Sequence, residues 1–167
     1  MTDNENLALV ADIGGTNARF ALADIGSGMP RLYRQETLPT ADYASLPHAA
    51  EAYLDKHKMK PAMASFAVAC PVSGDEIRLT NRAWAFSQRE LQASLGLDHQ
   101  LVINDFGAAA LATLAIGDGD RVILHGTPDS QRKGPITVIG PGTGLGVALL
   151  VGDDRRGGDA AARRVAG

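Results

Sequence analysis

Apolar residues recur along this chain at two spacings, which divide it into expected strands and helices. Where they alternate with polar residues or run together they predict strands, and where they recur every three or four positions they predict helices. The expected strands are 7–13, 18–24, 31–37, 63–72, 76–80, 101–103, 121–124, 136–139 and 145–151. The expected helices are 42–58, 88–95 and 106–116. An opening run of strands followed by strand–helix alternation predicts an α/β domain with a mixed sheet.

Residues at the ends of two of these helices support the assignment. Pro47 lies within 42–58 and is tolerable only near the first turn of that helix. Ser87 and Glu90 have the spacing of a capping box, and Gly96 is a suitable stop for the helix between them. The segment 63–72 is apolar at nearly every position, which predicts a strand covered on both faces.

Composition and charge narrow the class of protein. The 167 residues are 45% hydrophobic and 21% charged, which excludes fibrous and disordered classes. A net charge of −3 disfavours nonspecific nucleic-acid binding, so we expect a small-molecule partner. The uncharged apolar stretch 107–117 is too short to cross a membrane, and the acidic start does not resemble a secretory signal. A single cysteine excludes an internal disulfide, so we expect a cytoplasmic protein without a structural metal.

The last fifteen residues, 153–167, differ in composition from the rest. They contain only Asp, Arg, Gly, Ala and one Val, which cannot bury a core, so we expect this tail to be disordered. All five residue types have GC-rich codons. One hypothesis is therefore that a frameshift near Gly152 replaced the true continuation, and the alternative is a flexible natural tail.

Two strand–turn–strand elements place a threonine among glycines. Glycine turns let backbone N–H groups approach phosphate oxygens, and a threonine hydroxyl adds a donor. The two elements contain Asp12-Ile13-Gly14-Gly15-Thr16 and Gly142-Thr143-Gly144. Each alone is also an ordinary hairpin, but two of one kind in a chain indicate a site for the phosphates of one nucleotide. The spacings of the P-loop and of G-x-G-x-x-G are both absent from the sequence.

Two acidic positions at strand ends are candidates for chemistry. Asp12 would face magnesium through water, and the alternative is a turn residue that caps its own strand. Asp105 follows Asn104 at the end of a buried strand, where an N-cap explains one carboxylate adequately. An enzyme that moves phosphate to an alcohol needs a carboxylate beside the attacking hydroxyl, and Asp105 is suited to that role.

Four other side chains are expected to have ordinary structural roles. We expect Cys70 to be a core residue rather than a nucleophile, because it lies in an apolar run. Trp84 and Phe86 are expected to pack around a loop, with sugar stacking as the alternative. His57, between two lysines, is expected on a solvated helix face.

Four segments, in order, carry a resemblance to a known family. LVADIGGTNARFALAD, ACPVSGDEIRLTNRAWAF, INDFGAAALA and GPGTGLGVALLV together resemble the bacterial ATP-dependent glucokinases over 7–152. The resemblance implies an actin-like ATPase (ribonuclease H-like) α/β domain with a mixed sheet, followed by the truncated start of a second α/β domain. It divides the chain into a smaller domain, 1–116, the beginning of a larger one, 117–152, and the tail, 153–167.

The resemblance also implies roles for individual residues. The segment from Asp12 through Thr16 would hold the phosphates of Mg-ATP, with the turn around Thr143 on the other side. Asn104, Asp105 and Asn81 would contact glucose, and Asp105 would accept the proton of its 6-hydroxyl. Glucose and ATP are then the partners, and a homodimer is allowed for a full-length member.

The family pattern continues beyond the second glycine turn into an E-G-G-H motif that this sequence lacks. We therefore expect a truncated chain that is inactive, or nearly so, by itself. The alternatives are a non-catalytic sugar-binding or regulatory module of the same fold and a nonfunctional fragment.

Overall fold

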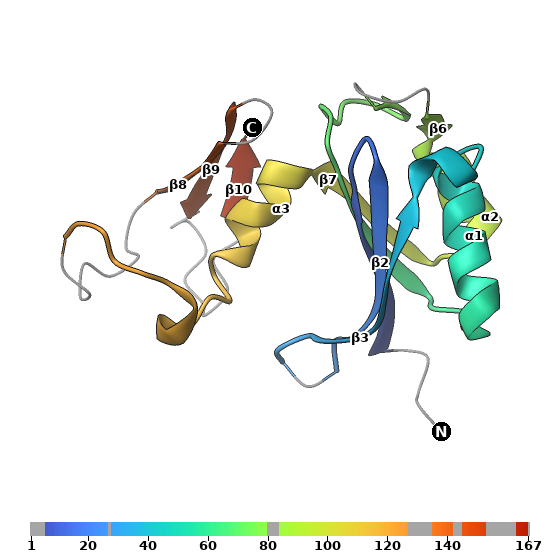
Figure 1. The fold of residues 1–167 in the computed structure, drawn as a ribbon, viewed down its shortest axis with the longest axis horizontal. Coiled ribbons are helices and arrows are strands. Elements are labelled where there is room, and N and C mark those ends of the chain that lie inside the picture. Colours follow the sequence, from blue (N-terminus) through green and yellow to red (C-terminus); the bar gives the residue numbers. More distant parts are fainter. Residues whose placement is uncertain are drawn as a thin grey trace. The chain divides into compact units, whose positions relative to one another are not determined.

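The computed structural model describes residues 6–26, 28–79, 84–126, 135–141, 145–152 and 163–166. The chain divides into two compact units, Met1–Asp105 and Phe106–Gly167 (Figure 1). In the described residues, no helix has the length and apolar character needed to cross a membrane. Our expected division of the chain after residue 116 stays a prediction.

A five-stranded mixed sheet forms the centre of the first unit. Its order is β3-β2-β1-β4-β7. The parallel strands are β1 (Leu7–Ile13), β4 (Met63–Val68) and β7 (His99–Asn104). The antiparallel strands, β2 (Asn17–Asp24) and β3 (Arg31–Pro39), extend it as a meander. The opening meander that the sequence predicts is confirmed.

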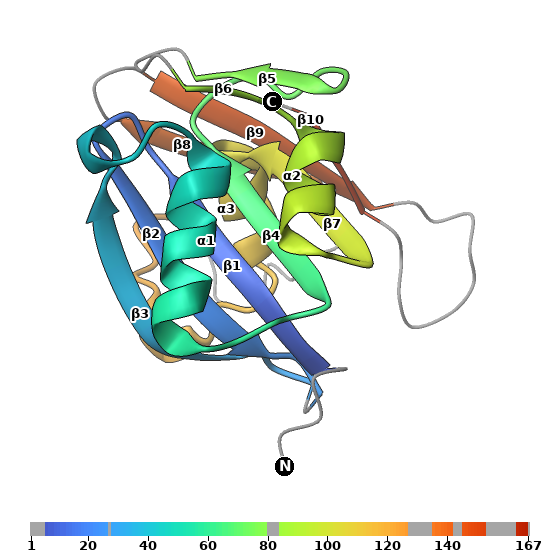
Figure 2. The same cartoon turned by 90° about the vertical axis from the view of Figure 1, so that its right-hand side faces the viewer.

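Two helices, α1 (Leu46–His57) and α2 (Gln88–Leu95), cover one face of this sheet (Figure 2). Alternate strand residues point toward them, because successive side chains of a strand face opposite sides. The core that results includes Leu9, Phe20, Leu22, Phe66 and Val68 from the sheet and Leu46, Ala49, Ala50, Tyr53 and Leu91 from the helices.

A hairpin and a short turn complete the first unit. The hairpin pairs β5 (Glu76–Arg78) with β6 (Ala85–Ser87), and the turn is the 3₁₀ helix η2 (Thr40–Asp42). Trp84 is buried and donates a hydrogen bond from Nε1 to the carbonyl of Tyr43 at 3.0 Å. Trp84 and Phe86 belong to the core, so packing explains both aromatic side chains.

The capping residues predicted for α2, and the position of Pro47 near the start of α1, are present in the structure. Pro47 lies in the first turn of α1, and the hydroxyl of Ser87 accepts the N–H of Glu90 at the start of α2. Gly96 ends α2 in the left-handed conformation with φ 64°. Lys58 ends α1 in the same conformation with φ 53°, although it has a Cβ.

The second unit contains a smaller sheet. α3 (Asp105–Ala112) leads into it, η3 (Asp118–Asp120) follows, and the sheet has the order β10-β9-β8. Its strands are β8 (Ile136–Pro141), β9 (Leu145–Gly152) and β10 (Arg163–Ala166). Ala110, Ala148 and Leu150 form a small core, on which Phe106 packs.

The ring of Phe106 lies against two glycines of this sheet. A Cβ at Gly146 would lie 1.9 Å from Cε2 of the ring, and a Cβ at Gly140 would lie 2.7 Å from Cε1. Gly140 and Gly146 are paired across β8 and β9, so together they form a flat surface that only glycines leave open.

The structure differs from several of the expected elements. The expected helix 42–58 begins only at Leu46, since Thr40–Asp42 form η2, and the expected helix 106–116 ends at Ala112. Residues 121–124 are not a strand: Val122 and Leu124 are 84% and 93% exposed, because in the described residues this apolar run has no partner strand. The expected strand 63–72 ends at Val68, and its residues alternate between buried and half-buried. Within the expected disordered tail, β10 pairs with β9, since ladder hydrogen bonds need only the backbone.

Candidate functional site

The parallel register brings three strand ends to one edge of the first unit's sheet. Ile13 of β1 pairs with Val68 of β4, and Val68 pairs with Asn104 of β7. The N–H of Ala69 continues the ladder by donating to the carbonyl of Ile13 at 3.1 Å. Ile13, Val68 and Asn104 thus form one row across the three strands, with Asp12 next to Ile13 and Asp105 next to Asn104. This is the side where ligands bind in open α/β sheets.

The β1–β2 turn lies at this edge. The N–H of Gly14 donates to the carbonyl of Asn17 at 2.9 Å and closes the turn. In the described part of the chain, the N–H groups of Gly15 and Thr16 have no hydrogen-bond partner, and Thr16 is exposed. Gly14 is not in the left-handed region, so the turn does not need it for its backbone angles. The two N–H groups and the Thr16 hydroxyl are suited to phosphate oxygens.

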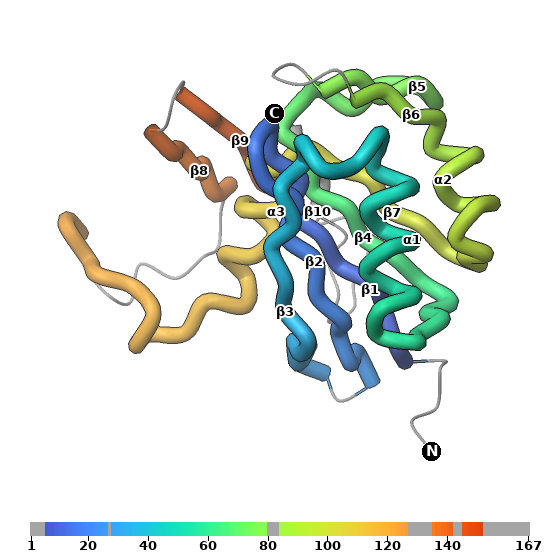
Figure 3. The backbone as a smooth tube through the Cα atoms, turned by 45° about the vertical axis from the view of Figure 1, so that its right-hand side comes forward, coloured from blue at the N-terminus to red at the C-terminus, as the bar shows by residue number. Residues whose placement is uncertain are grey.

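Thr40 supports this turn from the end of β3. Its hydroxyl donates to the carbonyl of Gly15 at 2.9 Å, and its N–H donates to the carbonyl of Thr16 at 2.9 Å. Its residue surface is only 1% exposed. The connection that carries Thr40, coloured cyan, passes the blue β1–β2 turn in Figure 3.

Asp12 is paired with a residue across the same hairpin. Register places it opposite Arg19, and Nη1 of Arg19 donates to Oδ2 of Asp12 at 2.8 Å. Both side chains are more than half exposed, so water reaches the carboxylate. Because the Asp12 carboxylate is exposed to water and already paired with Arg19, it is better suited to contact a metal ion through water than to bind it directly.

Asn104 links the other two strand ends. Its Nδ2 donates to the carbonyl of Cys70 at 3.2 Å and to Oδ1 of Asp105 at 2.9 Å. Asp105 is half-buried at the first residue of α3. The amide thus fixes the orientation of the carboxylate relative to the chain that leaves β4.

Cys70 is a buried free thiol next to this group. It is 3% exposed, and burial raises the pKa of the thiol above its usual value, with the negative charge of Asp105 as a second cause. A thiol kept protonated is a poor nucleophile. Its interpretation as a core residue is confirmed.

His57 is not on a solvated face, contrary to our expectation. Its ring lies 4.6 Å from the ring of Tyr53, and Nε2 lies 3.3 Å from Oε2 of Glu36. The carbonyl of His57 also accepts a hydrogen bond from Nη1 of Arg34 at 2.9 Å, so the last residue of α1 lies against β3.

Some predicted site residues lie outside the described part of the chain. Asn81, Gly142, Thr143 and Gly144 are among them, so their roles stay predictions. Among the described residues, no group of three or more His, Cys, Asp or Glu side chains could hold a metal ion.

Arg19 and Thr40 were not among the residues predicted from the sequence. The hairpin pattern contained a signal for Arg19, because residues opposite one another on paired strands share a face. The sequence contains no comparable signal for Thr40, whose contacts depend on where β3 ends.

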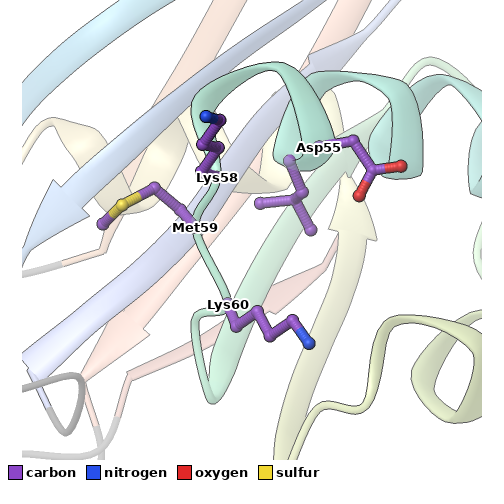
Figure 4. A pocket seen from close by; sticks show the side chains of 5 residues that line it. Asp55, Lys58, Met59 and Lys60 are labelled. Atoms are coloured by element: carbon purple, nitrogen blue, oxygen red, sulfur yellow. The ribbon is translucent and has the colours of Figure 1, made fainter.

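A separate hollow of about 420 Å³ lies at the end of α1. It is lined by Leu54, Asp55, Lys58, Met59 and Lys60. Figure 4 shows the side chains of Lys58, Met59 and Lys60 spreading apart rather than converging. Substrate sites have convergent polar groups, so we do not assign the chemistry to this hollow.

Comparison with known proteins identifies the family. The family model for glucokinase matches residues 9–161. The chain belongs to the glucokinase family. The glucokinase of Cronobacter sakazakii is 44% identical over 149 residues, which cover 89% of this chain and 46% of that protein. The glucokinase of Yersinia pestis is also 44% identical, over 89% of this chain and 45% of its own length.

Solved structures of glucokinases share the fold. One from an Antarctic psychrotroph has a TM-score of 0.80 at 37% identity, covering 95% of this chain and 49% of that chain. A ROK family glucokinase from Streptomyces griseus, solved with glucose and AMPPNP, has a TM-score of 0.62 at 22% identity. The match covers 91% of this chain and 46% of that chain. The expected fold class is confirmed. The chain spans about half the length of these glucokinases.

Proposed function

We propose that this chain contributes the phosphate turn and the catalytic base of a glucokinase. The reaction transfers the γ-phosphoryl group of ATP to the 6-hydroxyl of glucose and gives glucose 6-phosphate, the entry to glycolysis. The observation that supports this best is the row Ile13–Val68–Asn104, which brings the glycine turn with its exposed Thr16 and a half-buried carboxylate to one sheet edge. Membership of the glucokinase family supports the choice of reaction.

Asp105 is the proposed general base. As the 6-oxygen of glucose forms its bond to the γ-phosphorus, the bond from that phosphorus to the bridging oxygen of ADP breaks, and the hydroxyl proton passes to the Asp105 carboxylate. Asn104 keeps the carboxylate oriented through its 2.9 Å hydrogen bond. Asn104, Asp105 and Asn81 are the proposed sugar contacts.

The segment from Asp12 through Thr16 is proposed to bind the ATP phosphates, with Gly142, Thr143 and Gly144 as the second contact. Magnesium, when bound, neutralises charge on the phosphates. The exposed carboxylate of Asp12, already paired with Arg19, would reach such an ion through water. We also propose that residues 1–116 and 117–152 belong to the two lobes of the kinase and that it acts in the cytoplasm.

An activity assay with one substitution tests the proposal. Because the chain spans about half of its relatives, the assay uses both the purified chain and a chimera. The chimera joins residues 1–152 to the part of the Cronobacter sakazakii glucokinase that follows the matched region. Glucose 6-phosphate formation is followed with a coupled dehydrogenase.

We expect turnover by the chimera and a loss in kcat of about 10²-fold or more in Asp105→Asn, since a general base contributes that much. Asp98→Asn, an exposed aspartate of the same unit, is the control and should keep full activity. An active Asp105→Asn chimera would contradict the assignment of the base.

Sugar binding without turnover is the second candidate function. It is favoured by the extent of the match, which covers 46% of the Cronobacter sakazakii glucokinase. Titration calorimetry of the purified chain with glucose, with and without ATP, separates the two: a binding module takes up sugar and forms no glucose 6-phosphate.

A further inference from the structure

Thr40 is a buried polar side chain that the predicted site does not include. It begins η2 immediately after β3 and is 1% exposed. Both of its donors bind the β1–β2 turn: the hydroxyl binds the carbonyl of Gly15 and the N–H binds the carbonyl of Thr16, each at 2.9 Å. A buried hydroxyl that bonds to a loop carbonyl 25 residues earlier restricts how that loop can turn.

These two bonds fix two successive peptide groups. The described chain contains no cis peptide, and in a trans peptide the C=O and the following N–H point in opposite directions. With the carbonyl of Gly15 held toward Thr40, the N–H of Thr16 points away from it. That N–H has no partner within the described residues, on an exposed residue of the turn.

We propose that Thr40 is a positioning residue for polyphosphate: it keeps the carbonyls of Gly15 and Thr16 on its own side, so that the N–H of Thr16 faces the ligand. This inference rests on the proposed phosphate role of the turn. Without the hydroxyl, the Gly15 carbonyl loses its partner, and the peptide can rotate and present an oxygen to the phosphates. The negative end of the carbonyl dipole then faces the anionic phosphates and repels them, where the N–H attracted them before.

The test is an NMR titration of the full ¹⁵N-labelled chain with inorganic tripolyphosphate. The amide resonances of Gly15 and Thr16 report binding directly, and no turnover is needed. Thr40→Val keeps the shape and the backbone N–H but removes the hydroxyl. Thr40→Ser restores the hydroxyl, and Thr37→Val, an exposed position on β3 just before Thr40, is the matched control.

We expect Thr40→Val to weaken tripolyphosphate binding roughly tenfold, the effect of one well-placed hydrogen bond, while Thr40→Ser and Thr37→Val bind as the wild type does. Fluorescence of Trp84 in urea gives the folded fraction of each variant. If Thr40→Val does not fold, Thr40→Ala, which introduces no new bulk, replaces it.

Three results would overturn the inference. Equal binding by wild type and Thr40→Val removes the positioning role and leaves the phosphate turn intact. Weakening that only follows the loss of folded protein, or that Thr40→Ser does not rescue, makes Thr40 merely structural. If the wild type does not shift Gly15 and Thr16 at all, the proposed phosphate function fails together with the inference.

Discussion

Tyr53 shows how one residue joins helix to sheet in the first unit. Its ring stacks on Phe20 with centroids 5.3 Å apart, and its hydroxyl donates to the carbonyl of Arg34 at 2.8 Å. Arg34 itself has a φ of 55°, at a bulge where β3 shifts register against β2. The Tyr53 hydrogen bond therefore satisfies a carbonyl that the bulge removes from the ladder.

The ionisation of Tyr53 gives a prediction about alkaline pH. Burial, and then the charge of Glu36, raise its pKa to about 12. The folded pKa lies above the unfolded value of about 10, so this residue stabilises the fold fully below pH 10 and loses that contribution as pH rises toward 12. Urea unfolding should show a steeper alkaline loss of stability in wild type than in Tyr53→Phe.

Tyr53→Phe should also cost about 1 kcal/mol at neutral pH, because the Arg34 carbonyl loses its donor. The difference in absorbance at 295 nm between the two proteins isolates the phenolate of Tyr53. A midpoint near pH 10 in that difference would contradict the burial argument.

At the scale of elements, α1 and α2 end with the same backbone turn but with different residues. α2 uses Gly96 at φ 64°, where nothing lies within 4 Å of an added Cβ. α1 uses Lys58 at φ 53°. In the left-handed region an L-residue with a Cβ is strained whatever the space around it. The two helix ends therefore have the same conformation, but only α2 has glycine, the residue that favours it.

Substitutions at these two positions should change the free energy of unfolding in opposite directions. We expect Lys58→Gly to raise the free energy of unfolding by about 0.5–1 kcal/mol and Gly96→Ala to lower it by about 1 kcal/mol. Lys60→Gly controls for the loss of a lysine, because Lys60 is outside the left-handed region. Chemical denaturation measures all three, and a stabilising Gly96→Ala would contradict the argument.

Sequence pattern predicted most elements of the first unit because its signals are local. The alternation in 7–24 and the Ser87 and Gly96 caps depend on neighbouring residues only. The prediction for 121–124 was wrong, because an apolar run becomes a strand only beside a partner, and nothing local indicates one. Asp12, Asn104 and Asp105 could be predicted because local signals mark the strand ends at which the structure places them. Thr40 could not, because its contact partners are distant in sequence.

At the scale of the whole molecule, the two units have separate interiors. The first contains a large core and the single tryptophan, Trp84. The second relies on a small core and on the Phe106 ring against Gly140 and Gly146. A defect at those glycines should therefore affect the second unit alone.

Gly146→Ala tests this separation. A methyl group 1.9 Å from the Phe106 ring must displace it, and we expect a loss of about 2 kcal/mol or more from the second unit. Amide hydrogen exchange should accelerate in β8 and β9, while the urea transition of Trp84 fluorescence stays unchanged. Gly119→Ala, where an added Cβ has open space, is the control. A shift of the Trp84 transition would show that the units unfold together.

The burial of Cys70 has a practical consequence. It is the only cysteine, it is 3% exposed, and its carbonyl is held by Asn104. A thiol reagent can therefore modify the chain only during the brief openings of this sheet edge, and the labelling rate measures how often they occur. A ligand that binds the closed edge would slow that rate in proportion to its occupancy. The labelling rate of Cys70 therefore reports ligand binding, whether or not any phosphate is transferred.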